Sequence, residues 1–179
     1  MHRTNKDIFL ARLMRERDRL ELLINQIGFT RQLTLQGVSG KWSIKDILAH
    51  LLAYELYIAD RMHEILHGEI YIPCKTQNAL DAFLDQFGYP DFGSPLLDDD
   101  APNTWVIEKY RNVALEEVVM QEIQAFASIV VSLQEMTEEM IASHNLYERV
   151  ANNTYKHYRE HIRDIHKWLV ENAANSRDS

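Results

Sequence analysis

The sequence lacks the features that mark secreted, membrane-spanning and nucleic-acid-binding proteins. Cys74 is the one cysteine among 179 residues, so the chain cannot form an internal disulfide. No apolar run approaches the roughly 18 residues that cross a bilayer, and the first twenty residues carry charges where a signal peptide would be apolar. Acidic residues outnumber basic ones by 27 to 19, and a net charge of −8 argues against nucleic-acid binding. These absences predict a cytoplasmic protein that binds neither membranes nor nucleic acid.

Apolar residues are abundant and follow a helical period. They make up 46% of the chain, enough for one domain spanning residues 1–179 to bury a core without disulfides. Four patterns with a 3.6-residue period are present, at about 4–27, 43–67, 113–138 and from Asn145 or Asn152 to about 172. The second is the best delimited, because Ser43 and Asp46 can form a capping box. The sequence therefore predicts an all-α fold, a four-helix bundle.

The segment 68–104 separates the second and third helical patterns. It contains all four prolines and three of the six glycines, together with an acidic run at 98–100. A short helix over about 76–87 is expected within it, with loop elsewhere. A connection of this length makes a long crossover between helices 2 and 3 of the bundle.

The eight histidines sort by their position on the helical wheel. His157 and His161 lie four residues apart on the apolar face of the last helix, and His50 lies at the edge of the apolar face of the second. Three inward histidines would form a metal site with an open coordination position, which is typical of catalytic rather than structural sites. The alternative is that they are hydrogen-bonded core histidines. The other assigned histidines point away from these faces: His63, His67 and His166.

A three-histidine site would hold one divalent transition metal ion, with zinc or nickel expected first. Histidine binds metal only when neutral, and its ordinary pKa is about 6.5. The sequence alone therefore predicts that the metal leaves as the pH falls from about 7 toward 5.

Three further polar residues lie near the expected site. Asp46 either caps the second helix or orients the His50 ring. Tyr54 lies one turn after His50 and is a candidate pocket residue, although it can also be core packing. Arg61 shares the same apolar edge and needs a partner. It is expected to pair with Glu122 or, alternatively, to bind an acidic substrate from the pocket.

Two segments resemble a known family. Residues 41–55 read KWSIKDILAHLLAYE, and residues 154–168 read TYKHYREHIRDIHKW. Together they resemble the DinB-like superfamily of metal-binding four-helix bundles. The HYREHI wording and the NTWV segment at 103–106 resemble its ClbS/DfsB-type branch. Carried over residue by residue, the resemblance implies a metal triad of His50, His157 and His161.

The resemblance implies several functions, because the superfamily includes thiol S-transferases, a thiol-dependent isomerase, hydrolase-like proteins and a toxin-resistance protein. The first expectation is an enzyme whose metal activates a low-molecular-weight thiol or water on a small-molecule substrate. The alternatives are a non-catalytic bundle that binds or sequesters a small molecule or metal, and a structural dimer with a vestigial metal. A homodimer is also expected, because the third helix is apolar over more of its circumference than one bundle face requires. The alternative is that the 68–104 segment covers this apolar surface within the chain.

Overall fold

The computed structural model describes residues 4–28, 30–98 and 100–175. Within these ranges the chain is helical, with no strand beyond a single bridge between Ser39 and Trp42. The all-α prediction is confirmed. In chain order the helices are α1 (Asn5–Ile27), α2 (Thr30–Leu33), α3 (Ile44–His67), α4 (Gln77–Phe87), α5 (Ala101–Tyr110), α6 (Leu115–Glu135), α7 (Glu138–Ser143), α8 (Leu146–Asn153) and α9 (Tyr155–Asn175).

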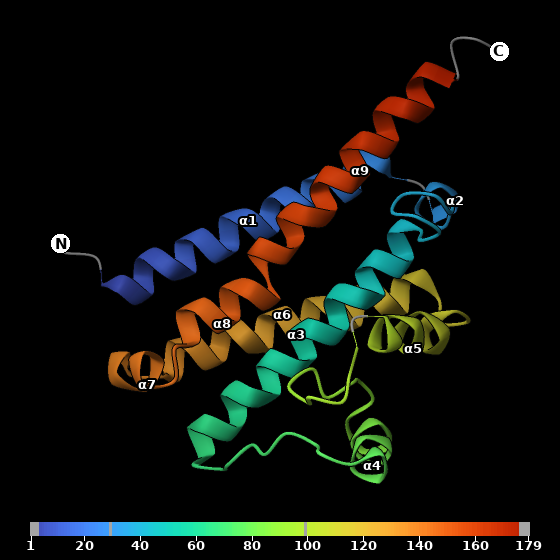
Figure 1. The fold of residues 1–179 in the computed structure, drawn as a ribbon. Helices are drawn as coiled ribbons and strands as arrows, with labels where there is room; N and C mark the ends of the chain where they lie inside the picture. The colour runs from blue at the N-terminus through green and yellow to red at the C-terminus, as the bar shows by residue number, and fades with distance from the viewer. Residues whose placement is uncertain (1–3, 29, 99, 176–179) are drawn as a thin grey trace.

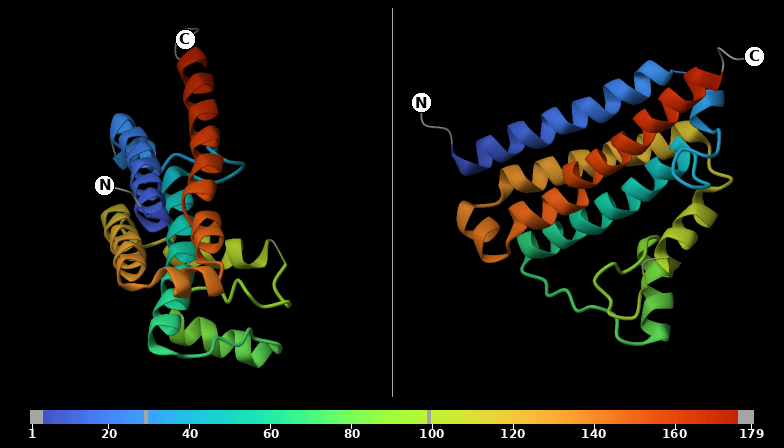
Figure 2. Two further views of the ribbon diagram at one scale, coloured as in Figure 1. Left: turned by 90° about the vertical axis from the view of Figure 1, so that its left-hand side faces the viewer. Right: turned by 45° about the horizontal axis from the view of Figure 1, so that its top comes forward.

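The four longest helices are α1, α3, α6 and α9, and they pack along one another. In Figures 1 and 2, α1 lies beside α9 and α3 lies beside α6. The pair α1 and α9 runs in one direction and the pair α3 and α6 in the other (Figure 1). Because α3 and α6 are parallel neighbours, the chain that leaves the end of α3 must run back along the length of α3 before α6 can begin. The 68–104 segment provides that connection.

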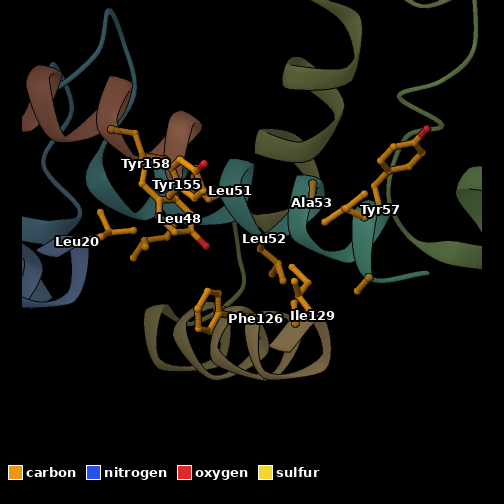
Figure 3. Packing of buried hydrophobic residues seen from close by; sticks show 14 of the residues in the cluster. Leu20, Leu48, Leu51, Leu52, Ala53, Tyr57, Phe126, Ile129, Tyr155 and Tyr158 are labelled. Atoms are coloured by element: carbon orange, nitrogen blue, oxygen red, sulfur yellow. The ribbon is translucent and has the colours of Figure 1, made fainter. Parts of the chain in front are cut away.

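Helix α3 is the central element of the core. Its buried residues lie around most of its circumference, which is expected of a helix enclosed on several sides. Figure 3 shows its side chains meeting α1 through Leu20, α6 through Phe126 and Ile129, and α9 through Tyr155 and Tyr158. The predicted capping box is confirmed, since the side chains of Ser43 and Asp46 each accept a hydrogen bond from the other's backbone N–H. Helix α3 is thus held firmly at the end that carries His50.

The expected boundaries differ from the structure in two places. The connection 68–104 contains the expected short helix α4, but its end is also helical, because α5 begins at Ala101 with Pro102 in its first turn. The last predicted helix is broken at Thr154, whose φ of −130° and ψ of −106° separate α8 from α9. Asn145 precedes α8 with a φ of 49°, a left-handed conformation that asparagine tolerates.

The apolar excess on the third predicted helix remains partly uncovered. On α6, Val118, Ile129 and Leu133 are buried, whereas Ile123 and Val131 are half-exposed. The connection 68–104 packs against α3 through α5 and leaves these two residues open. The homodimer stays a prediction.

Candidate metal centre

The three predicted histidines meet in space. His50 lies in the second turn of α3, while His157 and His161 lie in the first two turns of α9. The Nε2 atom of His157 is 2.8 Å from Nε2 of His50 and 3.2 Å from Nε2 of His161. One ligand atom from each ring lies within 4.8 Å of the others. The convergence predicted from the helical wheels is confirmed.

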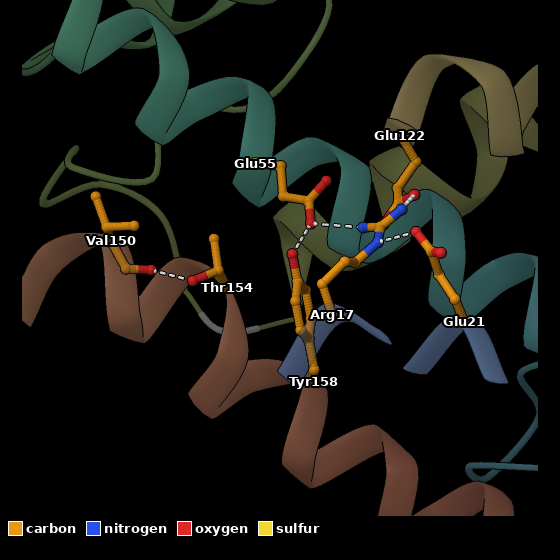
Figure 4. Close-up of polar contacts among 7 residues, drawn as sticks. All are labelled: Arg17, Glu21, Glu55, Glu122, Val150, Thr154 and Tyr158. Atoms are coloured by element: carbon orange, nitrogen blue, oxygen red, sulfur yellow. Dashed lines mark hydrogen bonds and ion pairs between the residues drawn. The ribbon is translucent and has the colours of Figure 1, made fainter. Parts of the chain in front are cut away.

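The break at Thr154 sets the direction of α9 and therefore the position of two of these rings. The Thr154 hydroxyl donates to the Val150 carbonyl oxygen at 2.6 Å (Figure 4). The Tyr158 N–H donates to the Thr154 carbonyl at 2.9 Å. The hydroxyl and the carbonyl of Thr154 therefore both form hydrogen bonds, as a fully buried residue requires. The new helix starts at Tyr155, two residues before His157, so both His157 and His161 lie in its first two turns.

The geometry fits one metal ion. Zinc–nitrogen bonds of about 2.0–2.1 Å in tetrahedral geometry place ligand nitrogens about 3.3 Å apart. The observed Nε2 separations of 2.8 and 3.2 Å are close to that spacing. All three rings turn the same nitrogen inward, and neutral imidazoles are ordinary ligands of divalent transition metals. The donor set therefore suits zinc, nickel or a related ion.

Several residues lie around the rings of the triad. The Trp42 ring packs against the His50 ring with centroids 4.9 Å apart, and the Asn103 side chain approaches His50 from α5. Asp164 Oδ2 lies 3.7 Å from Nδ1 of His161. The 3.7 Å separation is too long for a hydrogen bond, and the buried Nδ1 atoms of all three histidines have no hydrogen-bond partner among the described residues. Asp46 instead serves the helix cap, as one of the two sequence readings expected.

Burial keeps the three histidines neutral. Desolvation, followed by the charges of the neighbouring rings, lowers the pKa of His50 to about 2. The same causes, in the same order, lower the pKa of His157 to about 3. Burial also lowers the pKa of His161, and the nearby carboxylates of Asp164 and Glu160 partly oppose this effect. The site is thus held in the protonation state that binds metal.

These pKa values move the expected pH of metal release downward. In the unfolded chain these histidines take up protons below about pH 6.5, whereas in the folded chain they do not. The folded state therefore loses stability as the pH falls below that value, and protons reach the ligands only when the site opens. We expect the metal to be retained at about pH 5.5 and lost together with tertiary structure at lower pH.

Elemental analysis after dialysis, paired with near-ultraviolet circular dichroism at each pH, measures both transitions. Loss of metal by about pH 5.5 from a protein that is still folded would show that the ligands keep their ordinary pKa.

A cavity of about 450 Å³ opens onto the triad. Its lining includes all three histidines together with Ser39, Trp42, Tyr54, Phe92, Ser94, Leu97, Asp98, Pro102, Asn103 and Glu160. The predicted pocket residue Tyr54 is therefore present, stacked on Phe92 with ring centroids 3.9 Å apart. A larger groove of about 780 Å³ runs between α1 and α9, but the histidine cluster does not line it.

Arg61 is placed elsewhere and does not line this cavity. Its NH2 group pairs with Glu64 at 2.5 Å, and its guanidinium lies 4.0 Å from the centre of the Tyr71 ring. The expected pairing with Glu122 was wrong, because an arginine from another helix takes that carboxylate. The face of α3 that carries Arg61 is covered by Tyr71 and Phe83 of the crossover, rather than by α6.

That other arginine is Arg17 of α1, which binds Glu122 of α6 through both guanidinium NH2 groups. Figure 4 shows it also reaching Glu21 at 2.7 Å and Glu55 of α3 at 3.5 Å, while Tyr158 of α9 donates to Glu55. Burial and the Glu122 charge raise the pKa of Glu55 well above its usual range. This buried network links the four long helices, and Tyr158 is adjacent to the ligand His157.

One of the residues that the sequence analysis missed, Arg17, had a recognisable sequence signal. Arg17 lies between the buried residues Leu13 and Leu20 at helical spacing, so it is a charged residue inside an apolar stripe. The lining residues Asn103 and Phe92 had no comparable signal, because their place near the triad depends on how the crossover folds back.

His63 and His67 lie near each other, with ring centroids 4.1 Å apart, outside the triad.

Comparison with protein-family models, with curated proteins and with solved structures finds no match to this chain. Among the described residues, no helix combines the length and the apolar character that a membrane crossing requires.

Proposed function

We propose that the chain is a metal-dependent enzyme of the DinB-like type, a four-helix bundle with a long crossover between its second and third long helices. His50, His157 and His161 hold one divalent transition metal ion, zinc or nickel. The ion activates a low-molecular-weight thiol or water against a small-molecule substrate. The observation that carries this proposal is the convergence of three Nε2 atoms at a cavity, from the buried His50 and His161 and the half-buried His157. The segment and motif resemblance supports it.

The donor set supports catalysis more than a structural role. A divalent ion on three neutral histidines keeps an open position, where it can lower the pKa of water toward about 7 or bind a thiol as thiolate. A structural zinc site is usually closed by four protein ligands. Among the described residues, no fourth histidine, cysteine or carboxylate joins the group. The three histidines line a cavity large enough for a small molecule, which would give a substrate access to an ion held there.

The surrounding residues have separate tasks in this proposal. Trp42 packs against the His50 ring, with Asn103 beside it, and the Asp164 carboxylate lies 3.7 Å from His161. Tyr54 and Phe92 form an aromatic wall that positions the substrate. The core network around Arg17 fixes α9 against α3, and so maintains the relative positions of the three histidines.

Cobalt substitution tests the proposal directly. We expect one cobalt ion per chain, with absorption in the visible range typical of low-coordinate cobalt, and a new charge-transfer band when a small thiol is added. Turnover of thiols with electrophiles, and of activated esters with water, then identifies the reaction. Unfolding of the protein on chelation would instead indicate a structural metal. Metal and thiol binding with no turnover would favour a sequestering protein.

A further inference from the structure

The charged residues that line the cavity above the triad are acidic. Among the residues that the structure describes, Asp98 and Glu160 are the charged ones in its lining, and neither lysine nor arginine contributes to it. Glu160 lies next to His161 on α9 and forms no ion pair with any described residue, whereas its neighbour Arg159 is engaged by Glu16 at 2.9 Å. Asp98 accepts a hydrogen bond from the Ala101 N–H at 2.8 Å, and no lysine or arginine of the described residues forms an ion pair with it. Both carboxylates are exposed at the mouth of the site.

The lining also contains three aromatic rings, beside Ser39, Ser94, Leu97, Pro102 and Asn103. Tyr54 and Phe92 stack on each other, and Trp42 lies against His50 on the other side of the lining. Aromatic faces attract cations, and most strongly quaternary ammonium groups that are weakly hydrated. A lining of aromatic rings and free carboxylates therefore favours a positively charged ligand and disfavours an anionic one.

We infer that the site takes a small thiol whose distal end carries an ammonium group, and that it discriminates against thiols with a distal anion. This inference rests on the proposed metal centre, where the thiol sulfur binds. The ion and one thiolate together leave a single positive charge, and the carboxylates of Asp98 and Glu160 outweigh it. The rest of the ligand therefore lies in a negative electrostatic potential, to which the molecule's net charge of −8 also contributes.

Three ethanethiols that differ only in their distal group test the inference. Thiocholine carries a quaternary ammonium, 2-mercaptoethanol a hydroxyl and 2-mercaptoethanesulfonate a sulfonate, and none of these groups chelates the metal strongly. Each is titrated into the cobalt-loaded protein, and the thiolate-to-cobalt band gives its dissociation constant. We expect thiocholine to bind about tenfold more tightly than the sulfonate, with the hydroxyl compound between them, and salt to narrow the difference.

The variant Glu160→Gln should remove most of the preference for thiocholine over the sulfonate while keeping one cobalt per chain. Adding Asp98→Asn should reduce this preference further. Glu171→Gln is the matched control, because Glu171 is exposed on the same helix and does not line the cavity. It changes the net charge equally and should keep the preference.

Equal affinities for the three thiols, or tighter binding of the sulfonate, overturn the inference and leave the metal–thiol centre standing. An unchanged preference in both cavity variants overturns it as well. If cobalt binds and none of the thiols gives a band, thiol activation itself is wrong and the inference falls with it. If cobalt does not bind at all, the proposed metal centre is wrong.

Discussion

Replacing His157 with alanine is expected to abolish stoichiometric metal binding. The Nε2 atom of His157 is the one that lies within 3.2 Å of both other ligand nitrogens, so its removal leaves two rings without their shared neighbour. Loss of a residue that merely orients a ligand weakens metal binding about 10- to 100-fold. Loss of the ligand itself should therefore exceed about 100-fold. Isothermal titration with zinc, and elemental analysis of protein purified without a histidine tag, measure the effect.

His166→Ala is the matched control, because this histidine is exposed on the same helix and lies outside the cluster. It should bind metal as the wild type does. The apo form of His157→Ala should remain folded, since a buried imidazole is removed without leaving a charge behind. Full metal occupancy in His157→Ala, or its loss in His166→Ala, would refute the assignment of the ligands.

The second large effect is expected from Arg17→Met, which should lower the free energy of unfolding by about 3–5 kcal/mol. The substitution keeps the apolar stem, but it leaves Glu122 buried without its cation. A buried carboxylate without a partner is costly, because burial disfavours its charged form and the group must take up a proton. Urea denaturation followed by circular dichroism gives the change in stability.

Rescue by a second substitution separates the charge effect from the loss of packing. The double variant Arg17→Met/Glu122→Leu should recover most of the lost stability, since a buried ion pair can often be replaced by apolar residues at little cost. Arg19→Met is the control, because Arg19 is 62% exposed and its pair with Glu16 contributes little. If Arg17→Met proved no more destabilising than this control, the buried network would not hold the helices together.

The convergence of the three histidines could be predicted from the sequence because the helices that carry them are regular. A residue's side of a helix follows from its place in the 3.6-residue period, so His157 and His161 had to share one face. The Ser43 cap fixed the start of α3 and hence the angular position of His50. The three histidines then met because α3 and α9 each bury their apolar face against the same core.

The rest of the cavity could not be predicted in this way. Asn103 and Phe92 belong to the crossover, and their approach to the triad depends on contacts between residues far apart in the chain. Arg61 shared the apolar edge of α3 with His50, yet it lies three turns away, where the crossover covers it with Tyr71. The periodicity of a single helix does not reveal which neighbour covers which part of its length.

The sequence by itself determined the all-helical class, the limits of the long helices to within a few residues and the inward side of each ligand. These properties follow from local caps and from periodicity, which act within one helix. Only the tertiary structure decided that Arg17 of α1, rather than Arg61, neutralises Glu122, and that the last helix is broken at the buried Thr154. It also decided that Asp98 and Glu160 line one cavity. The physical reason is that burial and charge pairing depend on which helices are neighbours, and that choice is made by the packing of the whole chain.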